Sequence, residues 1–265
     1  MNDLAVLVRA TLALYRDAVV EASRAFARHA WVIVLPPAYS VVLAVVASFA
    51  SVLGIAGGFV MVLALAACVS SFLTVLEGAV ARDRVRPSEL APSFGRHLWS
   101  IVNVVFVLWI IEVLLGLITA QNPAMRWLAL AVNAGIFVLC NPLPELIYQG
   151  SREGLAMIDE AVQFMRENFV EWLLPLVLLL LPVFLIDVRA GILVMAELGP
   201  TSVLAVLMQI VERVLPEMGG AGEIVATFVA SAALVWMMLF RGFLFRSLAH
   251  SGRRQRIFAA RSRTG

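Results

Sequence analysis

The chain has 265 residues, of which 62% are hydrophobic and 14% are charged, and its formal net charge is +2. A soluble domain is roughly 45–50% apolar and about a quarter charged, so this composition excludes an ordinary soluble protein. It also excludes a disordered chain and a disulfide-stabilised scaffold, because apolar residues dominate and only two cysteines are present.

The first element predicted along the chain is an amphipathic helix over residues 4–26. Its apolar side chains recur every three or four residues, and arginines occupy the opposite face. Similar patterns predict two further amphipathic helices, over residues 151–168 and 202–215. We interpret all three as helices that lie in the membrane interface, with docking on protein partners or gating of a cavity as the alternative.

Six apolar segments are long enough to cross a bilayer, which takes about 20 residues for a hydrocarbon core of ~30 Å. Each is predicted as a helix, because the segments lack two-residue alternation and an open sheet cannot span lipid. The fold class is therefore an all-α polytopic membrane protein in a single membrane domain, residues 1–265. The predicted spans are Trp31–Leu53, Gly57–Val80, Leu98–Ala120, Met125–Tyr148, Phe169–Val188 and Glu223–Arg246.

Arginines are distributed unevenly between the two predicted faces of the membrane. Seventeen lie in the N-terminal segment, in the second and fourth loops and from Arg241 onward, whereas the opposite loops hold three. Because basic residues accumulate in cytoplasmic loops, both termini are predicted to be cytoplasmic, in a bacterial inner membrane. We interpret the basic tail, residues 249–265, as binding anionic lipid headgroups and not nucleic acid.

An internal repeat appears at an offset of 68 residues. The matching pairs are of scarce residue types: Phe26 and Phe94, Arg28 and Arg96, His29 and His97, Trp31 and Trp99, Glu77 and Glu145, and Arg84 and Arg152. A fainter third copy begins at Phe164 and Arg166. Each unit is predicted to be an amphipathic helix followed by a two-helix hairpin. The repeats cover about residues 1–85, 86–150 and 151–248, with an outer insertion at 190–220.

Each repeat carries an F-x-R-x-x-[W/F] motif where its first span begins. We interpret this motif as an interfacial anchor, because arginine reaches anionic headgroups while an aromatic ring lies at the headgroup level. The predicted anchors are Phe26, Arg28, Trp31, Phe94, Arg96, Trp99, Phe164 and Arg166.

Together with Leu76-Glu77-Gly78 at the end of a hairpin, this motif and the six-span architecture resemble a known family. It comprises bacterial six-helix membrane proteins of the type found as the membrane domain of some glycerophosphodiester phosphodiesterases. The resemblance covers most of the chain and implies a membrane component. It does not imply phosphodiesterase activity, because no soluble catalytic domain of that kind is present.

Polar residues inside the predicted spans are candidates for function, because burying them in hydrocarbon is costly. The depths of Glu112 and Asn133 in the third and fourth spans add up to about the thickness of the core, so we expect these side chains to meet. The same arithmetic pairs Asn103 with Asn141. Both pairs are interpreted as polar clamps between helices, with proton relay or cation binding as the alternative for Glu112.

A second polar group is predicted nearer the cytoplasm. Glu77 and Glu145 occupy equivalent repeat positions, and Arg241 falls at the corresponding hairpin end of the third copy. We expect the three to converge as a charge-compensated cluster, since two carboxylates facing a guanidinium allow all three to be buried. A transport or ligand site is the alternative.

The sequence contains no phosphate-binding loop, dinucleotide fingerprint or zinc motif, so no cofactor, metal or catalytic residue is predicted. Cys68 and Cys140 are interpreted as small hydrophobic residues. The function that the sequence favours is a non-enzymatic membrane component that transports a solute or belongs to a membrane complex. The alternatives are a structural or assembly factor, and an intramembrane lipid-modifying enzyme that uses Glu112 or Glu77 with Glu145 as acid–base groups.

Overall fold

The chain is a polytopic helical membrane protein. The computed structural model describes residues 3–81, 85–150, 152–186 and 219–250, and every regular element in these ranges is a helix. Five helical stretches within them are long and apolar enough to cross a membrane: Ala30–Leu53, Ile55–Ala81, Leu98–Gln121, Pro123–Gln149 and Ile224–Ala249. These stretches correspond to the first, second, third, fourth and sixth predicted spans.

The predicted fifth span, Phe169–Val188, falls within α8 (Leu155–Ile186), a long helix that is kinked at Asn168. The last two residues of that span lie outside the described residues. So do the predicted outer helix 202–215, most of the insertion 190–220 and nearly all of the tail 249–265. The six-span count and the fold of the third repeat therefore stay predictions.

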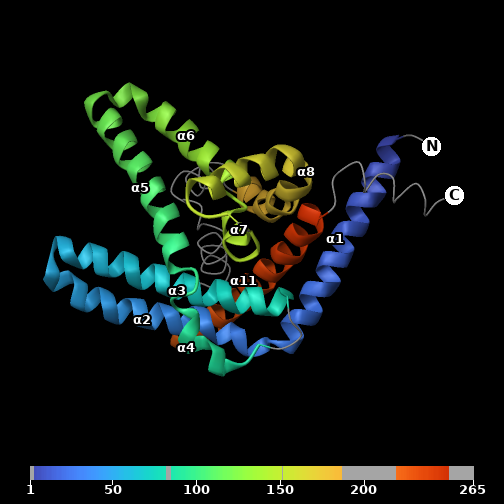
Figure 1. Cartoon of the computed structure of the whole chain (residues 1–265), viewed down its shortest axis with the longest axis horizontal. Helices are drawn as coiled ribbons and strands as arrows, with labels where there is room; N and C mark the ends of the chain where they lie inside the picture. Colours follow the sequence, from blue (N-terminus) through green and yellow to red (C-terminus); the bar gives the residue numbers. More distant parts are fainter. Residues whose placement is uncertain (1–2, 82–84, 151, 187–218, 251–265) are drawn as a thin grey trace.

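Two hairpins project toward the same side of the molecule (Figure 1). The first joins α2 (Leu35–Ala50) to α3 (Ile55–Ala81), and Gly54 adopts a positive φ of 56° in the turn between them. The second joins α5 (Leu98–Gln121) to α6 (Arg126–Leu139), where the Asn122 side chain accepts a hydrogen bond from the Ala124 N–H. Short 3-10 turns flank the apolar helices: η1 (Ala30–Val34), η2 (Ser51–Leu53), η3 (Pro87–Glu89) and η4 (Pro123–Met125).

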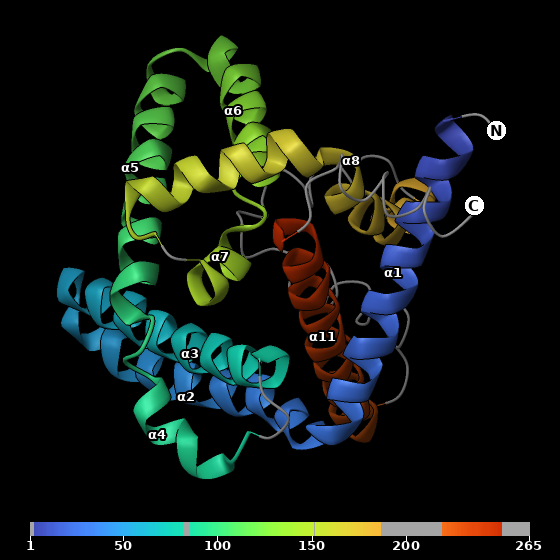
Figure 2. The same ribbon diagram turned by 45° about the vertical axis from the view of Figure 1, so that its right-hand side comes forward.

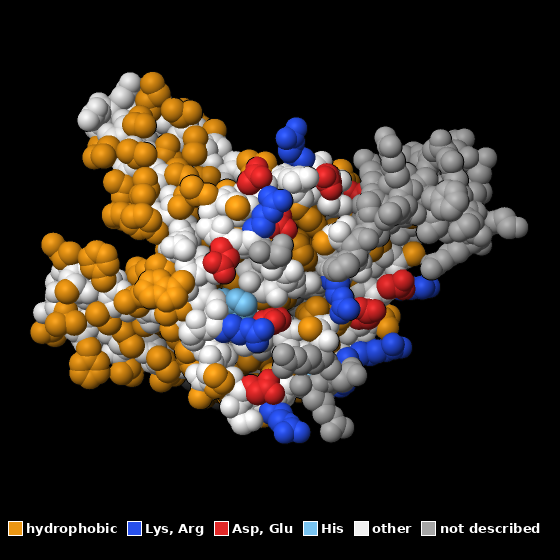
Figure 3. Space-filling view, in the orientation of Figure 1, with side chains coloured by type: hydrophobic (Ala, Val, Ile, Leu, Met, Phe, Trp, Pro, Cys, Tyr) orange, Lys and Arg blue, Asp and Glu red, His pale blue; other side chains and the backbone are white. Residues whose placement is uncertain are grey.

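Apolar and charged side chains occupy different parts of the visible surface. Hydrophobic side chains cover the two projecting hairpins, whereas charged side chains gather over the rest of the face seen in Figure 3. Lipid solvates the first kind of surface and water or headgroups the second. The hairpins are thus the parts of the molecule suited to the hydrocarbon core.

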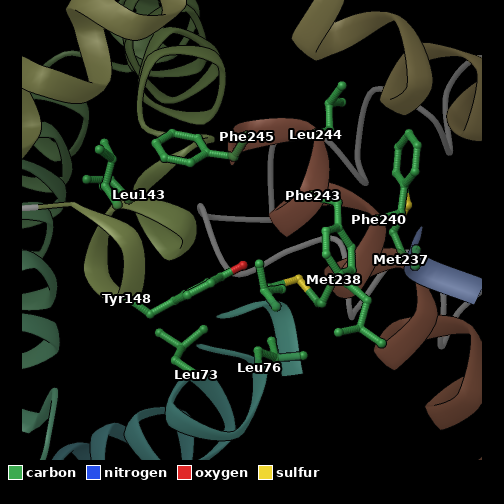
Figure 4. Close-up of a cluster of buried hydrophobic side chains, with 14 of the residues drawn as sticks. Leu73, Leu76, Leu143, Tyr148, Met237, Met238, Phe240, Phe243, Leu244 and Phe245 are labelled. Carbon is green, nitrogen blue, oxygen red and sulfur yellow. The ribbon is translucent and has the colours of Figure 1, made fainter. Parts of the chain in front are cut away.

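A core of buried apolar side chains lies where α3, α7 (Leu143–Gln149) and α11 (Gly219–His250) meet, as the close-up in Figure 4 shows. A side chain at Gly242 of α11 would collide with the Tyr148 hydroxyl of α7, so this glycine permits the close approach of the two helices. The Gln149 side chain also donates a hydrogen bond to the Gly242 carbonyl, at 3.1 Å. Helices α3, α7 and α11 therefore pack together close to the buried charged residues Glu145 and Arg241.

Helix α1 (Asp3–Arg28) forms as predicted but buries only part of its predicted apolar stripe. Figures 1 and 2 both show it lying along α11, which it contacts through a buried row formed by Ala18, Ala22 and Ala25. Small side chains let two helices approach closely. Of the predicted apolar stripe, Leu12 is 60% exposed and Val8 is 49% exposed. Helix α1 therefore packs on a helix that is long and apolar enough to cross a membrane, and its position in the membrane interface stays a prediction.

The three predicted repeats share a backbone break just before their first apolar helix. His29 (φ −121°, ψ 34°), His97 (φ −112°, ψ 8°) and Asn168 (φ −126°, ψ 22°) have similar non-helical geometry. Each lies three or four residues after the phenylalanine of its anchor motif. The His29 ring and the Asn168 amide also hydrogen-bond the carbonyl four residues earlier, which caps the preceding helix. At His29 and Asn168 the break separates a long amphipathic segment from the apolar helix that follows, whereas only the short helix Leu90–Ser93 precedes His97.

The contact between α1 and α8 generates a pH prediction. The Tyr15 hydroxyl donates a hydrogen bond to the Glu171 backbone carbonyl at 2.8 Å, and burial, helped by the negative charge of Glu171, raises the pKa of Tyr15 to about 12. Because the ordinary tyrosine pKa is about 10, the unfolded chain loses this proton first, and stability should fall as pH rises from about 10 to about 12. The melting temperature in detergent should therefore drop less steeply for Tyr15→Phe than for the unmodified chain. Parallel curves would contradict the assignment.

Candidate functional site

The candidate site is built around a break in the fourth predicted span. Helix α6 ends at Leu139, residues 140–142 form a turn, and α7 begins at Leu143. Pro142 has no N–H and disfavours helical geometry at Asn141, which explains why the helix stops there. Met125–Tyr148 is therefore two helices and not the single helix that was predicted. The break directs Asn141 and Glu145 toward α11.

Arg241 of α11 and Glu145 of α7 form a buried, two-pronged ion pair. The Nε and Nη2 atoms of Arg241 lie 2.7 and 2.9 Å from the two carboxylate oxygens of Glu145. The side chains are 6% and 0% exposed. Parallel N–H···O bonds of this kind fix both the distance and the orientation of the partners. The pair thus sets the position of α7 against α11.

Asn141 and Trp172 complete the surroundings of the guanidinium. Arg241 donates to the Asn141 side-chain oxygen at 3.0 Å and to its backbone carbonyl at 2.7 Å. The Trp172 indole N–H donates to the same side-chain oxygen at 2.9 Å, and its ring centroid lies 4.8 Å from the guanidinium carbon. This distance is within the range of cation–π attraction. Arg241 therefore makes four hydrogen bonds and an aromatic contact inside the protein. We call Arg241, Glu145, Asn141 and Trp172 together the arginine network.

An aromatic cluster packs beside the arginine network. Phe164 and Trp172 of α8 both contact Phe245 of α11, with ring centroids 4.7 and 6.1 Å away respectively. Phe164 is only 8% exposed. Its predicted role as an interfacial anchor is therefore wrong, because the kink at Asn168 turns this part of α8 onto the core. Of the other predicted anchors, Trp99 is 68% exposed, and Arg28 and Arg166 are also exposed.

Glu77 does not join the arginine network but makes a second ionic group. Its carboxylate oxygens lie 2.7 Å from Arg96 Nη2 and 3.1 Å from His97 Nε2. These partners stand at the start of the second repeat, close to the end of α3. Of the predicted cluster, the structure brings together Glu145 and Arg241 and pairs Glu77 elsewhere. The reason is that the guanidinium of Arg96 lies nearer to Glu77 than Arg241 does, at the less buried rim of the bundle.

The two predicted asparagine and glutamate clamps are not formed. Asn103 and Glu112 are exposed on α5, and no hydrogen bond within the described part of the chain joins them to Asn141 or Asn133. The oxygen of Asn141 is already bonded to Arg241 and Trp172. Helices α5 and α6 also diverge from their turn in Figures 1 and 2, which separates positions that hairpin arithmetic places side by side.

A buried hydroxyl chain was not predicted from the sequence. Tyr39 of α2 donates to Ser71 of α3 at 2.7 Å, and Ser71 shares a hydrogen bond of 2.7 Å with Ser93. Ser93 ends α4 (Leu90–Ser93), and its backbone carbonyl accepts from Ser70 at 3.0 Å. The consecutive serines in an otherwise apolar span were the available signal. This chain attaches α4 to the first hairpin.

The chemistry open to the arginine network is limited by its own bonds. The carboxylate oxygens of Glu145 both bind Arg241, and the Asn141 oxygen is shared by two donors. Among the described residues, no group of three or more His, Cys, Asp or Glu is placed to hold a metal ion. The arrangement is suited to holding α7, α8 and α11 together.

Glu145 and Glu77 provide a matched pair for mutation, since they occupy equivalent repeat positions but differ in burial. Glu145→Gln leaves Arg241 buried without its counter-charge, and we expect it to cost about 3–5 kcal/mol. Glu77→Gln acts on a half-buried pair near the rim and should cost about 1 kcal/mol or less. Thermal unfolding in detergent should therefore show a much larger drop in melting temperature for Glu145→Gln. Equal drops would contradict a central role for the arginine network.

Comparisons with family models, with curated proteins and with solved structures return no match to this chain.

Proposed function

We propose that this chain is a non-enzymatic integral membrane protein that serves as a subunit of a membrane complex, in a bacterial inner membrane. The observation that carries the proposal is the closure of the arginine network. Its charged groups are buried and bond to one another, so they hold helices in place. This favours a complex subunit over the transport component that the sequence suggested equally.

The distribution of charge supports the proposed orientation. Arg9, Arg16, Arg24 and Arg28 are exposed on α1, on the part of the molecule away from the apolar hairpins. Anionic headgroups of the cytoplasmic leaflet attract such residues by about 1 kcal/mol each. We therefore propose that both termini are cytoplasmic and that three repeated hairpins make six spans, as in the membrane-domain family that the sequence resembles.

A second candidate function rests on the group formed by Glu77, Arg96 and His97. The carboxylate and the imidazole are 3.1 Å apart and only partly buried, so an acid and a base lie together near the end of α3. A lipid-modifying enzyme needs such a pair within reach of a headgroup. This candidate differs from the first because it predicts loss of function from changes that leave the fold intact.

The topology is tested with a reporter that is active only in the cytoplasm. A reporter fused after Ser247 should be active. A reporter inserted at Gly54 or at Asn122 should be inactive, because these hairpin turns lie on the side of the membrane away from the cytoplasm in the proposed topology. Activity at either turn would overturn the proposed orientation.

The role of the charges is tested by replacing them with apolar residues of similar size. Each single change, Glu145→Leu or Arg241→Met, should destabilise the protein strongly, because it leaves one buried charge unpaired. The double variant removes both charges, so it should regain most of the lost melting temperature and should restore the phenotype of a strain that lacks the chain.

A stable double variant that fails to restore the phenotype would show that the charges themselves take part in transport or chemistry. The control for the second candidate is Glu77→Gln with His97→Gln. These substitutions should leave the phenotype intact in a complex subunit and abolish it in a lipid-modifying enzyme.

A further inference from the structure

The hairpin of α5 and α6 carries two polar side chains inside helices that are long and apolar enough to cross a membrane. Glu112 is exposed near the middle of α5, and Asn133 is half-buried on α6. Neither forms a hydrogen bond or ion pair within the described part of the chain. Both lie in helices long and apolar enough to cross a membrane. Polar groups in hydrocarbon are costly and normally face a partner.

Glu112 and Asn133 lie at the same depth. Glu112 is ten residues before Asn122 in the turn, and Asn133 is eleven residues after it. At a rise of 1.5 Å per residue, each is roughly 15 Å from the turn, close to the middle of a ~30 Å core. A carboxyl oxygen accepts hydrogen bonds and an amide donates them. The two side chains are thus complementary in chemistry and matched in depth, although they do not meet within the chain.

The surface around them is suited to another helix. Trp109 of α5 lies three residues before Glu112, so on the same side of the helix, and it is 55% exposed. A side chain added at Gly116 of α5 or at Gly135 of α6 would meet no atom within 4 Å, so the backbone is open to close approach at both positions. Small residues and polar side chains are the features that membrane helices use to associate. Figure 3 shows this hairpin as an apolar projection apart from the charged surface.

We propose that two copies of this chain pair through the α5–α6 hairpin, with Glu112 of one copy accepting a hydrogen bond from Asn133 of the partner subunit, and the reverse. A twofold axis along the membrane normal preserves depth, so it places each glutamate beside the asparagine of the partner subunit. Such an interface is self-complementary and makes the same contact twice. A second copy is favoured as the occupant because this hairpin carries both the acceptor and the donor.

This inference rests on the membrane-crossing position of α5 and α6 in the proposed function, and the two fail in different ways. A failed membrane assignment would appear as a chain that alkaline carbonate releases from membranes without detergent. A failed pairing would appear as a monomer that is still integral to the membrane.

The test measures self-association of the full chain in lipid vesicles, by energy transfer between labelled copies at increasing lipid dilution. The unmodified chain should dimerise. Glu112→Leu and Asn133→Leu should each raise the dissociation constant about tenfold, because each removes both equivalent hydrogen bonds. The double Leu variant should be no weaker than either single variant. The exchanged variant, Glu112→Asn with Asn133→Glu, should restore the affinity, since the partners only change places.

Asn103→Leu is the matched control. Asn103 is an exposed polar residue on the same helix, but it lies nine residues from Glu112 and therefore on the opposite side, so its loss should leave dimerisation unchanged. A monomer at every dilution would overturn the proposal. A dimer whose dissociation constant is unchanged by both Leu substitutions would also overturn it. So would a stable complex of α5 with a different membrane protein in place of the second copy. Melting temperatures of all variants identify any that misfold.

Discussion

The fold depends on the bond between Arg241 and Glu145, because among the described residues no other side-chain contact joins α7 to α11 through two parallel hydrogen bonds to a charged group. In a membrane, the hydrophobic effect does not drive helices together, since lipid is as apolar as their side chains. Close packing and hydrogen bonds must do so. A guanidinium that bonds a carboxylate and an asparagine, and lies over a tryptophan ring, fixes α7, α8 and α11 in one arrangement. The aromatic cluster and the close contact at Gly242 follow from that arrangement.

Sequence patterns were sufficient to predict the helices but not which side chains meet between them. Apolar length predicted the helices that cross the membrane, because lipid imposes a minimum span on any sequence. Repeat arithmetic also predicted that Glu145 and Arg241 meet, since hairpin ends of equal depth lie at one level. It failed for Glu112 and Asn103, because depth says nothing about which side of a helix faces its neighbour. Trp172 was missed for a related reason: its role depends on the kink at Asn168, whose side chain is an unremarkable amide in sequence.

The two ionic groups show how one repeated residue can acquire two roles. Glu77 and Glu145 occupy equivalent positions of the predicted repeat, yet Glu77 lies at the rim with Arg96 and His97 and Glu145 is fully buried. The difference comes from the chain that follows each residue. After Glu77 the chain turns back and supplies Arg96 as its cation, whereas after Glu145 the chain continues into α8 and the cation comes from α11. Similar sequence units therefore become structurally distinct by their order along the chain.

The distance in sequence between the members of the central ion pair has a consequence for biogenesis. Arg241 is made 96 residues after Glu145, which at typical rates of synthesis is a delay of roughly 5 to 20 s. During that interval the carboxylate has entered the membrane region without its cation. The second hairpin must therefore wait in a provisional position, near headgroups or held by an insertion factor. The arrival of α11 then supplies the missing cation, so a chain that stops before Arg241 lacks the ion pair that fixes α7.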